Sequence, residues 1–331
     1  MAVSEELTAS DFPVSAGRVY LNPLSPFYRA QLNFILVGWL SWFVFWRGEA
    51  SDQLGNGRFC ALIAAKNLAI GWAWIGGWHW FLYVQRAVPL EKKFNVAWPS
   101  EWQHRRDALF STLGILQASV LELGVMALYA RGAIPQLAVT LAQPASLAAA
   151  VAWVGILGIY ADVHFYFAVR MLMLVLLLVL LLVLLLLVLL LLVLTLPPPP
   201  FQHRILHPWS GKQPLRAPAW DLGALLYKHC HSLHHKSSNP GPWSGLSMHP
   251  VEHAFYFSRC LVVLSPLVAV HPVHFLYVLT RLQLGPAKGH HGFDHEGGSS
   301  YSHYLHHAKL ESNYGTNDLI PFDLWFNTRA F

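Results

Sequence analysis

The chain is poor in charged residues. Only 12% of its 331 residues are Asp, Glu, Lys or Arg, against about 25% in an ordinary soluble domain. It has instead 55% hydrophobic residues and 14 Trp and 12 Tyr, whose rings favour the interface between lipid and water. The composition therefore predicts an integral membrane protein. The formal charge of +5 suits cytoplasmic loops beside anionic lipid. Nucleic-acid binding is not expected, because no polar basic domain is present.

Cysteine is also scarce. Cys60, Cys230 and Cys260 are odd in number and include no CxxC pair, which excludes a disulfide framework. The start of the chain, Met1 to Phe12, is acidic and polar, so we expect no cleavable signal peptide. Residues 1–28 are interpreted as a soluble lead-in.

Long hydrophobic runs are abundant, and the fold expected from them is all-α. Residues 29–160 contain runs near the length that crosses a bilayer, and we expect about four transmembrane helices, at residues 30–46, 62–84, 109–129 and 147–160. Glu122 lies inside the third run. An intramembrane carboxylate is a functional candidate, but we favour a structural role for this one.

A further apolar stretch, residues 254–284, is broken by Pro266 and Pro272. A single crossing here would place the histidines before it and after it on opposite sides of the bilayer. We therefore expect a short membrane hairpin of two limbs, and a cytoplasmic, histidine-rich helical cap beside it.

Residues 168–201 differ from everything around them. The stretch is almost entirely Leu and Val, followed by four prolines, and its hydropathy alone would make it a membrane span. A fifth crossing would carry the histidines that follow to the lumenal side, because Lys92, Lys93, Arg105 and Arg106 mark the link before the third span as cytoplasmic. We interpret it as a low-complexity insert that interrupts a domain of residues 161–328. A genuine fifth span is the alternative.

Histidine is the residue that organises this domain. Four motifs, two HxxxH and two HxxHH, fall within about a hundred residues of a chain with 19 His. Residues three and four apart on a helix share a face, so each motif offers two or three imidazoles in one direction. The ten predicted metal ligands are His203, His207, His231, His234, His235, His291, His295, His303, His306 and His307.

Ten imidazoles exceed the needs of one ion, so the motifs predict a site for two metals. Nitrogen ligands suit Fe, Zn, Cu or Ni and argue against Mg and Ca. We expect the remaining histidines near the motifs to hydrogen-bond, cap or shield rather than ligate. They are His229, His249, His253, His271, His274 and His290.

Residues 160–328 resemble the fatty acid hydroxylase/sterol desaturase superfamily. The resemblance lies in the four histidine motifs in their order, in the His-Pro-Val-Glu segment at His249, in Asn-Tyr-Gly at Asn313, and in Phe-Asp-Leu-Trp-Phe-Asn-Thr, which ends at Thr328. The fourth motif, His-Tyr-Leu-His-His at His303, with the Asn-Tyr-Gly ending resembles the sterol desaturase branch more closely. The chain departs from the family pattern at the insert and at Asn327, where Gly is usual.

The resemblance implies a multi-pass enzyme of the endoplasmic reticulum membrane with a di-iron site facing the cytoplasm. It implies an O₂-dependent hydroxylation or desaturation of a sterol or fatty-acyl lipid, with electrons from NAD(P)H by way of cytochrome b5 and its reductase. Asp162, Glu252, Asp294 and Asp323 are candidates to orient the histidine rings. The alternative is a membrane protein of the same fold that binds zinc or has lost its activity.

Overall fold

The computed structural model describes residues 26–46, 53–135, 148–157, 160, 207–208, 217, 220–264, 270–294, 299–310, 312–314, 323 and 328. Over these residues the chain is helical, as predicted, and the β contact that it contains is an isolated antiparallel bridge between Lys93 and Phe293. The low-complexity insert, most of the lead-in, and the predicted ligands His203 and His295 lie outside the described residues.

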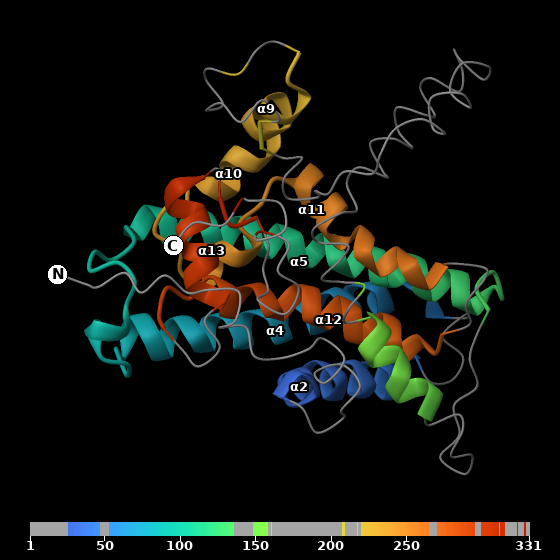
Figure 1. The fold of residues 1–331 in the computed structure, drawn as a ribbon. Coiled ribbons are helices and arrows are strands. Elements are labelled where there is room, and N and C mark those ends of the chain that lie inside the picture. Colours follow the sequence, from blue (N-terminus) through green and yellow to red (C-terminus); the bar gives the residue numbers. More distant parts are fainter. Residues whose placement is uncertain are drawn as a thin grey trace.

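Three long helical segments form the N-terminal half (Figure 1). They are α2 (Pro26–Ser41) continued by the π-helical turn η2 (Trp42–Trp46), α4 (Gly57–His79) continued by η3 (Trp80–Val84), and α5 (Glu101–Ala130). Side chains define where two of them start. Asn56 accepts from the Arg58 N–H at 2.9 Å, and the Ser100 hydroxyl accepts from the Gln103 N–H at 3.2 Å, as helix N-caps do.

The C-terminal half is made of shorter helices. In chain order they are α9 (Leu222–Leu226), η6 (Tyr227–His231), α10 (Ser232–His235), η7 (Pro242–Leu246), α11 (Pro250–Phe257), η8 (Ser258–Leu264), α12 (Pro272–Gly289) and α13 (Ser299–Lys309). The two limbs expected for the hairpin at 254–284 are α11 with η8, and α12.

Two helical segments are long and apolar enough to cross a membrane, Gly57–Val84 and Glu101–Ala130. They correspond to the second and third predicted spans. The first and fourth are also apolar helices, Gln31–Trp46 and Ala148–Leu157, but these are shorter.

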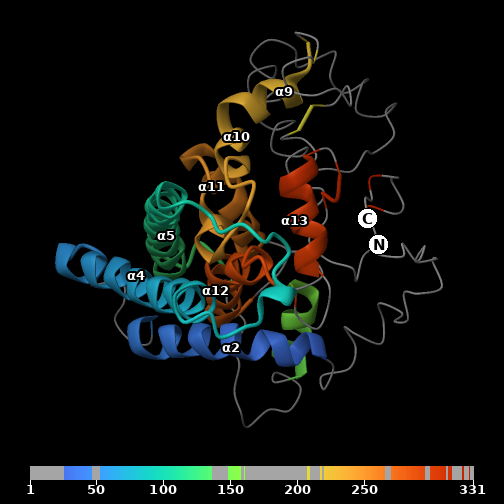
Figure 2. The same cartoon turned by 90° about the vertical axis from the view of Figure 1, so that its left-hand side faces the viewer.

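Helix α12 lies at the centre of the helical layers and packs against α2, α4, α5 and η7 (Figures 1 and 2). It approaches α2 closely at Gly38, where an added Cβ would lie 2.9 Å from the backbone nitrogen of Tyr277. A residue without a side chain is required there, and the close approach brings α2 against the most deeply buried helix of the structure.

Glu122 is fully buried between α4 and α5 and has partners for both carboxylate oxygens. One oxygen accepts from Lys66 Nζ at 2.6 Å and from the indole of Trp46 at 3.2 Å, and the other accepts from the amide of Asn67 at 2.7 Å. A buried charge is tolerated when it is paired in this way. These contacts are those of the structural role that we favoured.

The link between α4 and α5 is joined to the segment that follows α12. The Phe94 N–H donates to the Gly292 carbonyl at 3.0 Å, and the Asp294 N–H donates to the Lys92 carbonyl at 2.6 Å. The basic link and the C-terminal histidine segment therefore lie at the same end of the helical layers.

Candidate metal centre

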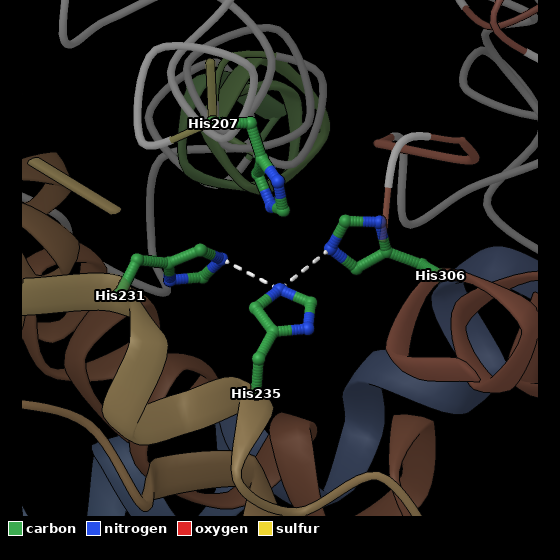
Figure 3. Close-up of side chains that lie close together, drawn as sticks. All are labelled: His207, His231, His235 and His306. Atoms are coloured by element: carbon green, nitrogen blue, oxygen red, sulfur yellow. Dashed lines mark hydrogen bonds between the residues drawn. The ribbon is translucent and has the colours of Figure 1, made fainter. Parts of the chain in front are cut away.

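Eight histidines form two buried groups of four. The first contains His207, His231, His235 and His306, and the second contains His234, His290, His303 and His307. Within each group the potential ligand nitrogens all lie within 4.8 Å of one another. Figure 3 shows the four rings of the first group converging on one point from separate segments of the chain.

The two HxxHH motifs are shared between the groups in a reciprocal way. The outer pair of the earlier motif, His231 and His235, joins the first group, and its middle residue His234 joins the second. The later motif does the opposite, because His303 and His307 join the second group and His306 joins the first. Adjacent residues on a helix point about 100° apart, so His234 and His235 are directed to different groups, as are His306 and His307, and each helix supplies both groups.

The distances between the Nε2 atoms match those of ligands on one ion. His235 Nε2 lies 3.0 Å from that of His231 and 3.1 Å from that of His306. In the second group, His290 Nε2 lies 3.3 Å from that of His234 and 2.9 Å from that of His303. Nitrogens each about 2.1 Å from an ion lie about 3.0–3.4 Å apart at octahedral or tetrahedral angles.

The Nδ1 atoms of four ligands face outward to fixed acceptors. His231 Nδ1 lies 2.7 Å from Glu252 Oε1, and His306 Nδ1 lies 2.6 Å from the Ser312 carbonyl. His234 and His290 face the carbonyls of Ser247 at 3.3 Å and Pro286 at 2.8 Å. An acceptor at Nδ1 holds the proton there, so the lone pair of Nε2 points into the group.

The rings are arranged to be neutral. Burial lowers the pKa of His235 and of His307 well below the usual value, and the neighbouring imidazoles lower it further. Burial lowers the pKa of His290 to about 4, against the opposing effects of the Pro286 carbonyl and the Asp107 charge. Neutral imidazole is the form that binds a metal.

His307 provides a direct test of whether these residues suit a metal. Its side chain is buried at 2% exposure, and neither ring nitrogen has a hydrogen-bond partner within the described segments. A buried nitrogen without a partner carries a desolvation cost, which an ion at the centre of the second group would remove. An all-imidazole donor set suits iron or zinc.

Seven of the ten predicted ligands are in these groups. The exception among the described residues is His291, whose Nδ1 accepts from the Phe293 N–H at 3.1 Å. The preceding residue, His290, takes a place in the second group, although we had expected it to cap or shield. The difference arises where α12 ends, because His290 follows Gly289 with its Nδ1 against the Pro286 carbonyl one turn earlier.

Four of the other flanking histidines have the expected roles. His249 and His271 cap α11 and α12 by accepting from backbone N–H groups at 3.2 Å. His253 and His274 hydrogen-bond the carbonyls of Leu246 at 2.9 Å and Ala150 at 3.0 Å. His229 is exposed.

The four predicted orienting carboxylates have different outcomes. Glu252 contacts a ligand directly, as described above. Asp323 acts on the ligands indirectly, through Tyr314. Its Oδ1 accepts from the Tyr314 N–H at 2.9 Å, and the Tyr314 ring packs against the rings of His207 and His306. Asp294 is exposed, and its backbone N–H pairs with Lys92. Asp162 lies outside the described residues.

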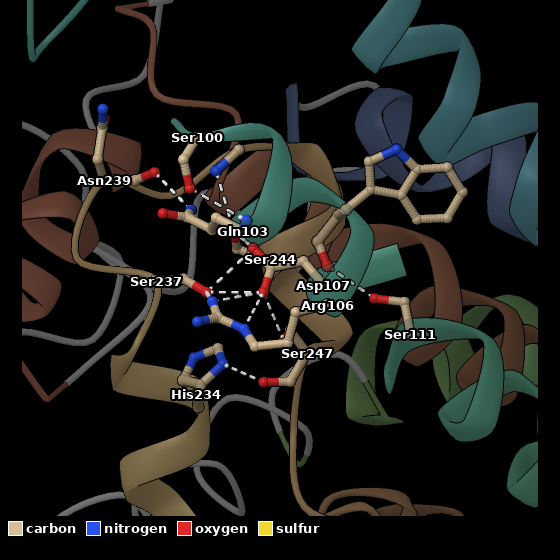
Figure 4. A network of polar contacts seen from close by, with 12 residues as sticks. Ser100, Gln103, Arg106, Asp107, Ser111, His234, Ser237, Asn239, Ser244 and Ser247 are labelled. Atoms are coloured by element: carbon tan, nitrogen blue, oxygen red, sulfur yellow. Dashed lines mark hydrogen bonds and ion pairs between the residues drawn. The ribbon is translucent and has the colours of Figure 1, made fainter. Parts of the chain in front are cut away.

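One buried carboxylate near the site was missed by sequence reasoning. Asp107 is 1% exposed and lies at the centre of a polar network that ends on His234 (Figure 4). An acid near the start of an apolar helix resembles an ordinary interfacial residue. The signal that could have found it is the polar series Gln103, Asp107 and Ser111, at helical spacing on a membrane span.

The comparison with known families agrees with the arrangement of the histidines. Residues 201–328 match the model of the family described as fatty acid hydroxylase, a range that includes both groups and ends at the predicted boundary, Thr328. No solved structure matches the chain. The resemblance inferred from the motifs is thus confirmed for residues 201–328.

Proposed function

We propose that the chain is a membrane-bound, O₂-dependent di-iron oxidoreductase that hydroxylates or desaturates a sterol or fatty-acyl lipid. The observation that carries this proposal is the pair of adjacent four-histidine groups. The rings of His235 and His307, one from each group, have centroids 4.8 Å apart. Ions bound in two adjacent groups could together supply the electrons that activate one O₂ molecule.

Iron supplies the ability to activate O₂ for attack on an unactivated C–H bond. In hydroxylation, one oxygen atom would enter the C–H bond and the other would leave as water; the two electrons come from NAD(P)H, and the two protons come one from NAD(P)H and one from solvent. The protein's part is to bind, orient and shield. Glu252 and the Ser312 carbonyl fix two rings of the first group, and the burial of all eight ligands excludes water that would compete for the open coordination positions.

We propose that the site faces the cytoplasm of an endoplasmic reticulum membrane crossed by about four helices. The support is the bonding between the segments 92–94 and 292–294. The first segment lies in the link that carries Lys92 and Lys93 and leads to Arg105 and Arg106 near the start of α5. Short loops rich in Lys and Arg lie on the cytoplasmic side, and the histidines of α13 follow directly from the bonded segment. A cytoplasmic site can receive electrons from NAD(P)H through cytochrome b5 and its reductase.

The test is metal content together with lipid conversion. We expect about two irons per chain in purified protein, and conversion of a supplied sterol or fatty-acyl lipid in a host that lacks its own enzyme. His234→Ala and His306→Ala remove one ligand from each group and should abolish conversion. His229→Ala, an exposed histidine in neither group, is the matched control and should keep it.

The sequence insert at 168–201 favours one competing function, a zinc-binding membrane protein of the same fold without oxidase activity. Stoichiometric zinc, with no conversion by the wild-type chain or by a chain from which the insert has been deleted, would establish that function and overturn the oxidoreductase.

A further inference from the structure

We propose that Asp107 is a positioning residue that sets the geometry of the second histidine group from the membrane-spanning helix α5. This inference rests on the metal centre of the proposed function, and it concerns a part of the chain that precedes the family match by almost a hundred residues. It links the Asp107 carboxylate on α5, through Ser247, to a ligand of the second group.

The Asp107 carboxylate is the acceptor for four different side chains. Arg106 donates to Oδ1 through Nη2 at 2.7 Å, and Ser237 and Ser247 donate to Oδ1 at 2.9 and 2.8 Å. Ser244 donates to Oδ2 at 2.7 Å. All three serines belong to the segment that follows the earlier HxxHH motif, so one charge on α5 gathers that segment around itself (Figure 4).

Ser247 transmits this constraint to a ligand. Its backbone has φ −76° and ψ 75°, and the Met248 N–H donates to the Leu246 carbonyl at 2.9 Å, which together define an inverse γ-turn centred on Ser247. The turn directs the Ser247 carbonyl toward His234 Nδ1, 3.3 Å away. The Ser247 hydroxyl donates to Asp107, so the carboxylate holds the turn in place. The turn then positions the Ser247 carbonyl that orients the His234 ring.

Other residues of α5 extend the same contact. Gln103 Nε2 donates to the Asn239 carbonyl at 2.9 Å, and the Ser111 hydroxyl donates to the Trp243 carbonyl at 2.7 Å. Gly114 leaves room for the ring of His253, since an added Cβ would lie 2.5 Å from its Nε2. These positions follow one face of the helix with Asp107, and this face holds the segment 237–247 in place.

The two groups thus receive support of different kinds. In the first, Glu252 touches the ligand His231 directly. In the second, the acceptors at the Nδ1 atoms of His234 and His290 are neutral carbonyls, and the carboxylate acts through the turn. Loss of the Asp107 charge should therefore weaken metal binding at the second group while the first keeps its affinity.

Zinc titration of the purified, metal-stripped full-length chain in detergent micelles tests this. We expect the wild type to bind two equivalents. Asp107→Asn should weaken one of them about 10- to 100-fold, the range seen when a partner of a metal ligand is removed. Glu122→Gln changes another buried carboxylate of α5, but one whose partners are Lys66, Asn67 and Trp46. It is the matched control and should bind both equivalents as the wild type does.

Ligand variants identify which equivalent is affected. His307→Ala removes a ligand of the second group and His207→Ala removes one of the first. Adding Asp107→Asn to His307→Ala should weaken the remaining equivalent less than twofold, because both changes act on the same group. Adding it to His207→Ala should weaken the remaining equivalent as strongly as in the single variant.

Ser247→Ala is the alternative test variant if Asp107→Asn does not fold. It removes the hydroxyl contact with Asp107 but keeps the carbonyl, and it should weaken the same equivalent several-fold. Equal affinities in the wild type, Asp107→Asn and Ser247→Ala, or equal weakening of both equivalents, would overturn the role of Asp107 and leave the metal centre intact. A wild-type chain that binds no zinc or iron would overturn the metal centre itself, and this proposal with it.

Discussion

Glu252 Oε1 lies 2.7 Å from Nδ1 of His231, and both side chains are buried. A carboxylate in this position fixes the ring and strengthens the imidazole as a donor to a metal at Nε2. We predict that Glu252→Gln lowers the affinity of the first group for iron or zinc about 10- to 100-fold, which a competition titration with a chelator of known affinity would measure.

Glu252→Gln should leave the second group unchanged, because its four ligands are held by other residues. Titration of the variant combined with His207→Ala should therefore show one equivalent of wild-type affinity. Loss of both equivalents in the single variant would mean that Glu252 maintains the fold rather than one ligand.

The metal-free protein should become less stable as the pH falls. His235, His290 and His307 have a lower pKa in the folded chain than the ordinary value of 6.5, and that of His290 falls to about 4. Between these values the unfolded chain binds more protons than the folded chain, so the free energy of unfolding decreases as the pH falls from about 6.5 toward 4. Thermal unfolding of the metal-free protein, followed from about pH 6.5 to about pH 4, measures this decrease in stability.

Bound metal should oppose this effect, because protons and the ion compete for the same nitrogens. The loaded protein should therefore keep its thermal midpoint to lower pH than the stripped protein, and should release metal where that midpoint starts to fall. A stripped protein with a constant midpoint between pH 6.5 and 4 would contradict the burial of neutral imidazoles.

Gly245 is the point where the segment after the earlier HxxHH motif meets α12. A Cβ there would lie 2.6 Å from the backbone carbonyl carbon and oxygen of Pro286, so Gly245→Ala must displace backbone. We predict a loss of about 1–3 kcal/mol in the free energy of unfolding, measured by reversible unfolding in mixed micelles.

Gly285→Ala is the control for that variant. It lies on α12 next to Pro286, and an added Cβ would meet nothing within 4 Å. Because alanine is the better helix former by up to about 1 kcal/mol, this variant should be as stable as the wild type or more so. Equal destabilisation by both substitutions would show that space at Gly245 is not the cause.

The ion pair between Lys66 and Glu122 provides a further prediction. Lys66→Met would leave the fully buried carboxylate without its cation, and we expect a loss of about 3–5 kcal/mol. The double variant with Glu122→Leu removes the stranded charge and should recover most of that loss. Detergent-mediated unfolding of the two variants, compared with the wild type, checks both values.

Sequence reasoning predicted that His207 and the two HxxHH motifs supply ligands to the centre, but not how these histidines divide between the two groups. The spacing of His231, His234 and His235 indicates faces of one helix, and it fixes that the outer pair acts together. It does not say that the middle residue faces a second ion, because this depends on where α13 packs. The predicted set of ligands was nearly complete because the spacing of histidines within a motif is local to one helix. Their division between the two groups was not predicted because it depends on tertiary packing.

The exchange of His290 for His291 has a similar cause. Adjacent residues after a helix end point in different directions, and the end of α12 at Gly289 is set by its packing rather than by the histidine motif. The polar series on the helix could have drawn attention to Asp107, but its role could not be assigned from sequence because its three serine partners are 130 to 140 residues away in the chain. The division of the apolar run into α11 with η8 and α12, by contrast, follows from its two prolines, while the membrane hairpin itself stays a prediction.

The reciprocal sharing of the two HxxHH motifs has a consequence for biosynthesis. Both groups take ligands from before residue 240 and from beyond residue 290, so neither is complete until a ribosome has made almost the whole polypeptide. A chain that ends before His303 holds three of the four ligands of the first group and two of the four of the second. The two sets are completed at neighbouring residues, His306 and His307, so neither site would gain its last ligand much before the other.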